Sequence, residues 1–373
     1  MLASFPVFYH HQYTPAHSLL RPDFDSPSVF CRLLDKDKGG YFSIHPQSDV
    51  TCTTKQQYLP SSNILQTRYI RDQGVVDVVD FFPRPKHSSV VPRGGPRQSG
   101  FREATTVQEE LKQWLVRRVE CIRGELALDV ELFPAFDYAL EPHVTTIVQP
   151  VHEPGSANSK TVTFHSKNLK LQLDVTIDKG EEDVDTCPSV IFKAEKRPGM
   201  LGEGVVARIL VQEGQAISFV LRSDIENHVT KSITSAVLDL QQHDTQTFWY
   251  NWISKSKYKG RWREVVARSL LILKLMTYEP TGAIIAAPTF SIPEDVGGVR
   301  SVLPLLVVRD GWPLVRKPPL RLTLKIQKKL GLSLLLGTGR ELHHLHPPPD
   351  GLHGRGRRLH GLHQPAYDEV SLT

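Results

Sequence analysis

Short apolar segments separated by polar turns fill the chain from about residue 40 to residue 222, and this pattern constrains its fold most strongly. Residues 64–69 and 75–82 are rich in β-branched and aromatic side chains. Asp72-Gln73-Gly74 between them is typical of a hairpin turn. The pattern therefore predicts two antiparallel strands here, joined by a tight turn.

The same kind of pattern continues along this region. Residues 114–123 and 126–133 alternate partly between apolar and polar side chains, and Gly124-Glu125 between them predicts a second hairpin. Further strands are expected at residues 161–165, 169–177, 189–193, 205–211 and 216–222. Many short strands joined by polar turns are typical of an antiparallel β-sandwich, so we expect a mainly β fold here.

A helical pattern replaces the strand pattern after residue 225. Apolar side chains recur at helical spacing in residues 231–253 and more regularly in residues 261–276. The second segment is apolar on nearly its whole circumference, which predicts that it is buried on two sides. Pro280 and Gly282 follow it as stop signals.

Charge is divided unevenly along the 373 residues. The formal net charge is +5, and residues 301–373 carry +6 while residues 1–300 carry −1. The last segment also holds 18 Leu, 8 Pro and 6 of the 16 His, but no Phe, Asn, Met or Cys. This abrupt change in charge and composition indicates that the sequence after residue 300 is of a different kind.

Composition argues against several classes of protein. No apolar run reaches the roughly 18 residues that a membrane-spanning helix needs, and residues 1–12 lack the basic start and apolar block of a signal peptide. Cys31, Cys52, Cys121 and Cys187 lie far apart without a CxxC pair, which argues against a zinc ribbon or a disulfide scaffold. Reduced thiols are typical of the cytosol, so we expect a cytoplasmic protein with no membrane partner.

Residues 83–106 are basic and rich in Pro, Gly and Ser, and a mobile surface loop is the favoured interpretation. An Arg-rich loop could instead bind nucleic acid, but aromatic side chains are almost absent from it. The basic segment after residue 300 also has few aromatic side chains. We therefore expect no nucleic-acid partner.

Two groups of histidines are the candidate metal ligands: His10, His11 and His17, and His343, His344 and His346. The first group has no acidic or Cys neighbour at a matching spacing. The second group stands beside three prolines, and composition alone would permit metal binding there. The first group therefore has no partner ligands, and the second lies in a tail whose origin, described below, argues against a function. We expect no metal site in either group.

Asp77 and Asp80 resemble a pair of catalytic carboxylates on one strand, but strand alternation explains them more simply. The chain contains no GxGxxG, GxxxxGK[ST], HExxH or GxSxG motif. The residue pattern alone therefore supplies no catalytic residue, no substrate-binding residue, no metal ligand and no cofactor site.

Four stretches resemble a known family. Residues 23–30 (DFDSPSVF) are followed by residues 39–44 (GGYFSI) and residues 258–262 (YKGRW), and residues 281–298 (TGAIIAAPTFSIPEDVGG) are the most specific part. Together they resemble glycoside hydrolase family 15, in the branch of glucoamylase-like and trehalase-like enzymes with an N-terminal β domain. The resemblance covers about residues 22–300.

The resemblance implies an N-terminal antiparallel super-sandwich, a helical linker and a catalytic (α/α)6 barrel. Enzymes of the family hydrolyse α-glucosidic bonds with inversion, in which one Glu protonates the leaving oxygen and a second activates water. The resemblance thus implies an α-glucoside or oligosaccharide substrate and no cofactor for the chemistry. The resemblance does not determine the oligomeric state, and a homo-oligomer is compatible with it.

The chain departs from the family at both ends. The family opens with strands that end in a Gly-Ser-Ile-Asp-Trp-like turn, which residues 1–20 lack. After Gly-Gly-Val-Arg the family continues Asn-Trp-Asp-Tyr-Arg-Tyr and then Arg-Asp, whereas Ser301-Val302-Leu303-Pro304 follows Arg300 here. Arg309-Asp310 is one position off that spacing and lacks the aromatic context, so we interpret it as coincidence.

A shifted reading frame accounts for the tail. Back-translation from Lys328 with one base dropped permits Arg-Asn-Trp-Asp-Tyr-Arg-Tyr, and permitted codons continue the family's pattern to Tyr367. We interpret residues 301–327 and most of 328–329 as the translation of an unspliced intron, or an equivalent insertion, of about 85 bases. The residues after it are then an out-of-frame reading.

These interpretations divide the chain into an atypical leader (1–21), a β-sandwich domain (22–225), a helical linker (226–257), the start of a catalytic barrel (258–300) and a disordered, aberrant tail (301–373). Most of the barrel would be missing, so we expect both catalytic Glu positions to be absent and the chain to be inactive. The alternative is a β-sandwich that acts alone as a binding or dimerisation module.

Overall fold

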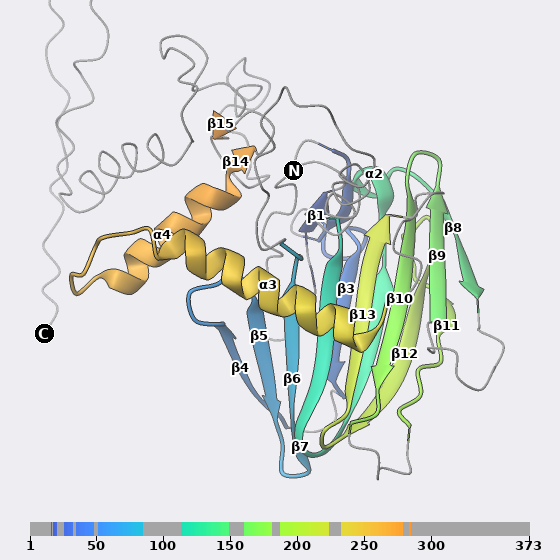
Figure 1. Ribbon diagram of the computed structural model, residues 1–373. Coiled ribbons are helices and arrows are strands. Elements are labelled where there is room, and N and C mark those ends of the chain that lie inside the picture. The colour runs from blue at the N-terminus through green and yellow to red at the C-terminus, as the bar shows by residue number, and fades with distance from the viewer. Residues whose placement is uncertain are drawn as a thin grey trace, which may run out of the picture. The chain divides into compact units, whose positions relative to one another are not determined.

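The computed structural model describes residues 16, 18–20, 26–32, 35–47, 51–84, 113–148, 160–180, 187–223, 233–278 and 283–284 of the chain. Their strands form two packed antiparallel sheets, and two longer helices follow the strands in sequence (Figure 1). The expected fold class, a mainly β antiparallel region followed by helices, is confirmed.

The larger sheet contains eight strands, and every neighbouring pair is antiparallel. In spatial order they are β4 (Thr53–Tyr58), β5 (Leu65–Ile70), β6 (Gly74–Phe81), β7 (Leu115–Phe133), β13 (Ala216–Ser223), β10 (Lys170–Asp178), β9 (Lys160–Ser166) and β8 (His143–Val148).

The smaller sheet is built on the second half of β7, which pairs with β3 (Tyr41–Pro46) on one side and β12 (Glu203–Gln212) on the other. β12 pairs in turn with β11 (Lys193–Lys196). Three short elements complete the described chain: the pair β1 (Ser18–Leu20) and β2 (Ser28–Cys31), the turn α2 (Phe136–Ala139), and the pair β14 (Thr277–Tyr278) and β15 (Ala283–Ile284).

One hydrophobic core fills the space between the two sheets and takes side chains from both. Phe42 of β3 packs against Phe219 of β13, with edge-on rings 6.3 Å apart between centroids. Tyr69 of β5 donates a hydrogen bond from Oη to the carbonyl oxygen of Ile44 on β3 at 3.0 Å. These contacts join one sheet to the other, so the sandwich packing is confirmed.

A single strand, β7, replaces the second hairpin expected around Gly124-Glu125, and that prediction is wrong. The 19 residues of β7 do not reverse direction: the first half pairs with β6 and β13, and the second half with β3 and β12. Gly124 lies at the change of partners with a φ of +66°, which L side chains rarely adopt. A Cβ there would overlap the carbonyl oxygen of Gln73. The glycine bends a continuous strand rather than closing a turn.

The first expected hairpin is confirmed. Asp72-Gln73-Gly74 leads from β5 into β6, and the Arg71 N–H donates to the Gly74 carbonyl oxygen at 2.9 Å. The strands expected at 161–165, 169–177, 205–211 and 216–222 are also confirmed, as β9, β10, β12 and β13.

Residues 189–193 do not form the expected strand, because only Lys193 of this segment belongs to one, β11. Val190 and Phe192 are nevertheless buried in the core between the sheets. Their apolar character therefore reflects burial of a non-strand segment.

Two structured segments carried no strand signal in the sequence. β4 consists of six polar or amphipathic residues (TTKQQY) and forms the edge of the larger sheet. Ala16 and Leu19 lie within the expected leader, yet both are buried. Ala16 exchanges backbone hydrogen bonds with Phe42 at 2.7 and 3.3 Å, so these residues pack on the sandwich.

Both expected helices are confirmed, as α3 (Ser235–Ile253) and α4 (Arg263–Leu275). The Thr234 side chain caps α3 by accepting from the Val237 N–H. The expectation that residues 261–276 are buried on two sides is wrong: Leu270 and Leu271 are buried, but Ile272 is 51 % exposed. One apolar stripe of α4 faces solvent.

Several expectations lie outside the described residues. They concern the mobile loop after residue 84, the stop signals Pro280 and Gly282, and the disordered tail after residue 300. Within the part that the structure describes, no helix has the length and apolar character needed to cross a membrane.

Substitution of Gly124 should destabilise the sandwich strongly. We expect Gly124→Ala to lower the free energy of unfolding by about 2–4 kcal/mol, because the new Cβ adds overlap with Gln73 to the cost of a positive φ. Gly214 also has a positive φ, but nothing lies within 4 Å of a Cβ there, so Gly214→Ala should cost only about 1 kcal/mol. Urea denaturation of both variants tests this, and equal losses would contradict it.

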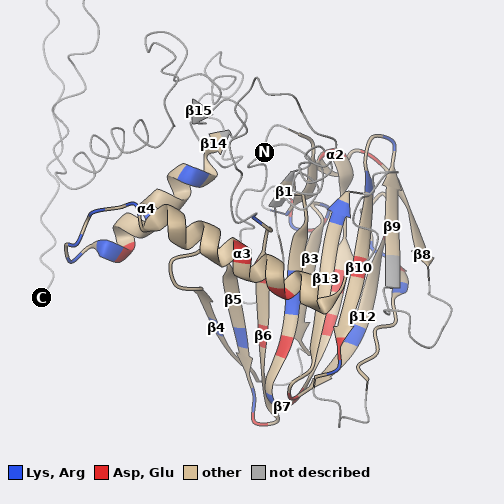
Figure 2. Cartoon of the chain, in the orientation of Figure 1, with Lys and Arg blue, Asp and Glu red and all other residues tan. Residues whose placement is uncertain are grey.

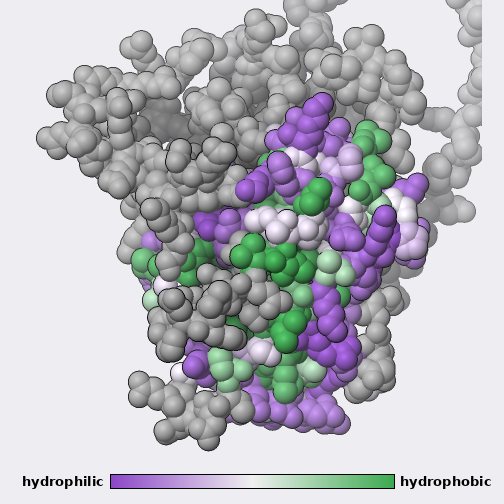
Figure 3. All heavy atoms as spheres, turned by 90° about the vertical axis from the view of Figure 1, so that its right-hand side faces the viewer, coloured by the Kyte–Doolittle hydropathy of each residue, from purple (hydrophilic) through white to green (hydrophobic). Residues whose placement is uncertain are grey.

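His143 lies at the start of β8, the edge strand of the larger sheet, and contacts the start of β12 in the smaller sheet. Its ring packs edge-on against Phe136 and Phe164, at 5.1 and 6.0 Å between centroids, and its Nε2 donates to the carbonyl oxygen of Glu203 at 3.0 Å. Figure 3 shows hydrophobic side chains gathered between hydrophilic ones on this side of the molecule. Val144 and Val148 of β8 are exposed. Burial lowers the pKa of His143 from its ordinary 6.5.

The lowered pKa of His143 makes the sandwich sensitive to acid. The unfolded chain binds the proton at a higher pH than the folded chain does, so this contribution to stability is complete above the ordinary value of 6.5 and is lost as pH falls toward the folded pKa. We expect His143→Gln to flatten the dependence of the free energy of unfolding on pH between about 7 and 5. A slope that is the same in His143→Gln as in the unsubstituted chain would contradict the assignment.

Candidate functional site

The helix α3 crosses the outer face of the larger sheet and buries a second apolar cluster against it (Figure 1). The sheet and the residues just before its strands contribute Ile64, Val79, Phe81, Trp114, Val116 and Val220, and the helical segment contributes Ile233 and Leu238. Because this cluster is separate from the core between the sheets, the helix is attached to a sandwich that is already closed.

Polar contacts fix α3 along its length. At its start, Ser235 Oγ donates to Asp178 Oδ2 of β10 at 2.7 Å. One turn further, Asp239 forms an ion pair with Arg118 of β7. Asp239 is 56 % exposed on its side chain, so this pair contributes less than about 1 kcal/mol. The pair therefore serves chiefly to set the position of the helix.

Near the middle of α3, the hydroxyl of Thr245 accepts a hydrogen bond from the backbone N–H of Arg84 at 2.8 Å. Both residues are buried, and Arg84 lies just beyond the end of β6. The contact ties the helix to residues 161 positions earlier in the chain. A buried N–H group needs such a partner, because leaving it unpaired costs free energy.

The second helix, α4, packs on α3, and its Arg268 contacts the sandwich. Trp249 of α3 contacts Leu271 and Leu275 of α4. Arg268 of α4 places its guanidinium 4.2 Å from the ring centroid of Tyr58 and donates to the Ser62 carbonyl oxygen at 3.1 Å. Burial raises the pKa of Tyr58 and lowers the pKa of Arg268.

The solvent side of α4 carries an apolar stripe, which we call the α4 stripe: Trp262, Val265, Ser269, Ile272 and Met276. These residues are separated alternately by three and four positions, a spacing typical of a seam between packed helices. The side chains of Trp262, Val265 and Ile272 are 47, 61 and 51 % exposed. Among the described residues, no element covers the stripe.

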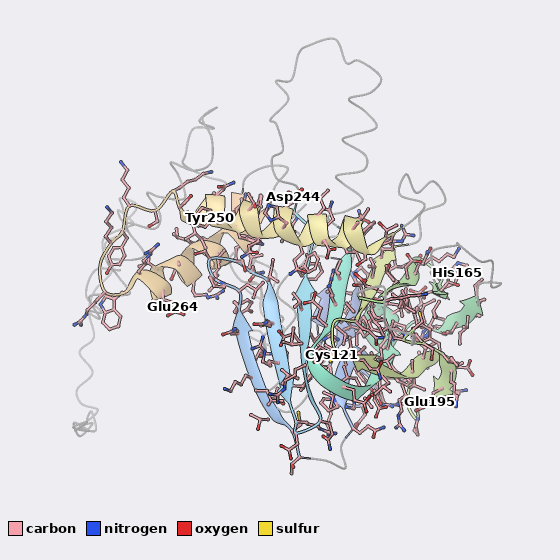
Figure 4. The ribbon with its side chains drawn as sticks, turned by 60° about the horizontal axis from the view of Figure 1, so that its bottom comes forward. Cys121, His165, Glu195, Asp244, Tyr250 and Glu264 are labelled. Atoms are coloured by element: carbon pink, nitrogen blue, oxygen red, sulfur yellow. The ribbon has the colours of Figure 1, made fainter. Side chains whose placement is uncertain are left out.

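Charged groups lie around the two helices. Figure 2 shows Lys and Arg gathered in the segment between α3 and α4 and at both ends of α4. Figure 4 shows Asp244 and Tyr250 on the side of α3 away from the sheet, and Glu264 at the start of α4. The helix pair thus forms a platform with a polar border and an apolar stripe.

Residues 258–262, one of the stretches that carry the family resemblance, lead into α4. The Tyr258 hydroxyl lies so close to Gly260 that a Cβ there would require the Tyr258 ring to shift. Arg261 places its guanidinium 4.5 Å from the ring centroid of Trp262. The structure therefore gives this motif a part in shaping the start of the helix.

Asp77 and Asp80 lie on opposite faces of β6 and serve separate ion pairs, as strand alternation predicts. Asp77 accepts from Arg68 Nε at 2.7 Å on the outer face. Asp80 accepts from Arg117 Nε at 2.8 Å inside the sandwich, where Arg117 also donates to the Phe42 carbonyl oxygen at 2.5 Å. The two carboxylates therefore belong to separate ion pairs and do not form one site.

The other sequence candidates fall mostly outside the described residues. Both groups of histidines and Arg309-Asp310 are among these, and so is all of 281–298 except Ala283 and Ile284. Within the described ranges, no three His, Cys, Asp or Glu side chains are grouped so that they could hold a metal ion. The four cysteines are all described, and all are free thiols.

The Arg268 contact was missed from the sequence, whereas the residues of the α4 stripe were predicted as apolar positions of a helix. The stripe was present as helical periodicity, but periodicity alone does not show which of two apolar faces meets a neighbour. The Arg268–Tyr58 contact joins residues far apart in sequence, and no local pattern predicts it.

Comparison with known proteins gives the chain its context. Residues 15–93 match a family model described as "Trehalase-like, N-terminal". Over 281 residues, 75 % of the chain, it is 29 % identical to the trehalase of Thermoplasma acidophilum, covering 40 % of that protein. It is 28 % identical to the trehalase of Mycobacterium tuberculosis and 29 % identical to that of Mycolicibacterium smegmatis, covering 37 % of each. The chain spans about two fifths of the length of these relatives, and the resemblance found in its sequence is confirmed.

The hydrogen bond between Thr245 of α3 and the Arg84 N–H can be tested directly. We expect Thr245→Val to lower the free energy of unfolding by about 1–3 kcal/mol, because it leaves the buried Arg84 N–H without its acceptor while keeping the side-chain volume. Thr247→Val, two residues further along the same helix at a half-buried position, is the matched control and should change stability by less than about 0.5 kcal/mol. Urea denaturation measures both, and an equal effect of the two would show that the hydrogen bond is not responsible.

Proposed function

We propose, because the chain carries a trehalase-like N-terminal domain and is a distant homologue of trehalases, that its parent protein is an inverting α-glucosidic hydrolase of the glucoamylase or trehalase type. The 281 residues of similarity carry this proposal. They are too many to fit within the β-sandwich between Ala16 and Ser223, so the relationship extends beyond that domain.

In this proposal the sandwich is a scaffold and the catalytic chemistry belongs to a helical domain that begins near α4. The α3 contacts with the sheet fix the direction in which the chain leaves the sandwich. The exposed α4 stripe is the seam on which further helices would pack. The parent then acts on an α-glucoside or oligosaccharide in carbohydrate metabolism, in the cytoplasm.

The 373-residue chain itself is proposed to be inactive. Inversion requires two carboxyl groups about 6.5–9.5 Å apart with a water between them. The buried carboxylates that the structure describes, those of Asp77, Asp80 and Asp174, are each paired with an arginine. The family pattern that should follow Arg300 is present only in the shifted frame that begins at Lys328.

Two linked measurements test the proposal. We expect the messenger RNA across codons 295–335 to lack about 85 bases after the Arg300 codon and to continue Asn-Trp-Asp-Tyr-Arg-Tyr. The purified 373-residue chain should release no glucose from trehalose, maltose or starch, while the product of the corrected message should hydrolyse at least one of them. Proton NMR at early times should show that the glucose whose anomeric carbon is attacked leaves as the β-anomer, as inversion of an α-glucoside requires. With trehalose, an equal amount of α-glucose from the leaving side should accompany it.

The trehalase of Thermoplasma acidophilum serves as the positive control for the assay. Hydrolysis by the 373-residue chain would contradict its proposed inactivity. An inactive product from a corrected message would contradict the enzymatic proposal for the parent.

A second candidate function is a binding or dimerisation module without catalysis. The closed core between the two sheets favours it, because such a domain does not need a barrel in order to fold. If the message retains the extra bases and the chain is a stable, folded dimer by light scattering and circular dichroism, this second function replaces the first.

A further inference from the structure

The two sheets of the sandwich end in the edge strands β4, β8, β3 and β11, and three of these are protected against pairing with another chain. β4 is polar, exposed over most of its length, and carries Lys55. β11 (KAEK) is charged and fully exposed. β3 exchanges backbone hydrogen bonds with Ala16 and ends in Pro46. Charge, proline and a covering segment are common devices that keep a strand edge from pairing.

The fourth edge, β8, carries none of these devices. Its sequence, HVTTIV, contains no Lys, Arg, Asp, Glu or Pro, and it pairs with β9 without a bulge. Among the strands that the structure describes, none pairs with the other side of β8. Its outward residues Val144, Thr146 and Val148 are exposed, the two valines by 68 and 53 %. An open, uncharged edge with β-branched side chains is a template on which a further strand can pair.

The inner face of β8 holds the strand on the sandwich. His143 Nε2 donates to the Glu203 carbonyl oxygen of β12 at 3.0 Å, and the Thr145 hydroxyl donates to the same oxygen. The His143 ring also packs against Phe164 of β9. Because β8 is already fixed as a strand, little conformational entropy is lost when its edge pairs with a partner.

The sequence of β8 matches itself in one antiparallel register. Opposite residues of an antiparallel pair share a face, so two copies related by a two-fold axis at Thr146 place Val144 opposite Val148 of the second copy. Thr146 then faces its own counterpart, which is a favourable cross-strand pair. On the inner face, Thr145 meets Ile147.

Charge also favours a second copy as the partner. Like charges directly opposite one another weaken a strand pair, and the six residues of β8 bring none together in this register. Pro142 precedes β8 and Pro150 follows it by two residues. Because proline cannot donate to the ladder, the two prolines limit the pairing to β8 itself.

We propose that β8 is a dimerisation surface, on which the β8 strand of a second copy of this chain adds in antiparallel orientation. The larger sheets of the two copies then form one continuous sheet. One pair of six-residue strands is a small interface, so the dimer dissociates in the micromolar range. The proposal rests on the β domain and is independent of the proposed hydrolase activity, so glucose release and dimer formation can each fail without the other.

Sedimentation velocity of the full 373-residue chain at pH 7, over micromolar concentrations, tests the proposal. We expect a concentration-dependent dimer. Thr146→Lys and Thr146→Glu should each raise its dissociation constant about tenfold or more, because two like charges then face each other at the axis. An equimolar mixture of the two variants should form the dimer again, because Lys then faces Glu.

The matched control is Thr54→Lys. Thr54 is exposed on β4, at the opposite edge of the same sheet, so this variant makes the same chemical change away from β8 and should leave the dissociation constant unchanged. Circular dichroism of each variant verifies that it is folded.

Several outcomes overturn the proposal. The chain could stay monomeric, Thr54→Lys could weaken the dimer as much as Thr146→Lys, or the mixture of Thr146→Lys and Thr146→Glu could stay monomeric. Association that survives Thr146→Lys also overturns it. If that association is lost in Val265→Glu, the contact between copies runs through the α4 stripe instead.

Discussion

The bend of β7 at Gly124 is the constraint on which the rest of the domain depends. One strand supplies the middle of both sheets, because its two halves take different partners on either side of a residue that has no side chain. The close approach of the Gln73 carbonyl at this point also joins the β5–β6 hairpin to the bend. The two sheets are thus connected by covalent backbone as well as by their shared core.

The closed sandwich in turn determines where the helices lie. Alternation along β6, β7 and β13 sends one set of apolar side chains into the core between the sheets and the other set toward α3. Buried arginines occur on both faces: Arg117 with Asp80 inside, and Arg222 with Asp174 outside. Paired buried charges of this kind contribute little net stability, but breaking one pair leaves an uncompensated charge and is costly. They therefore restrict the register of the strands more than they strengthen the fold.

Much of the fold was predictable from the sequence because it follows from local patterns. Helical periodicity located α3 and α4, and the turn at Asp72-Gln73-Gly74 located a hairpin. Gly124 shows the limit of such patterns: a glycine with positive φ serves a tight turn and a bent strand equally well, and only the distant partners β3 and β12 decide between them. β4 was not predicted, because an edge strand with polar side chains on both faces shows no alternation of apolar and polar residues.

The functional surfaces were less predictable, for a related physical reason. Arg268 and Tyr58 are separated by more than 200 residues, and nothing near either of them in sequence indicates their contact. The family resemblance supplied an expectation of chemistry, since confirmed as homology to trehalases, but it rests on motifs mostly outside the described residues. Contacts between residues far apart in the sequence, rather than any single motif, shape the surfaces that the structure describes.

The shared strand also has a consequence for how the chain is made. β7 pairs on one side with β3 and β6, which precede it in synthesis, but its other side waits for β12 and β13, which end at Gln212 and Ser223. At ribosomal rates of roughly 5–20 residues per second, a long strand edge stays unpaired for several seconds after β7 emerges. Non-local pairing of this kind folds slowly and exposes edges that can join other chains. The domain should therefore depend on chaperones during translation more than its stability once folded would suggest.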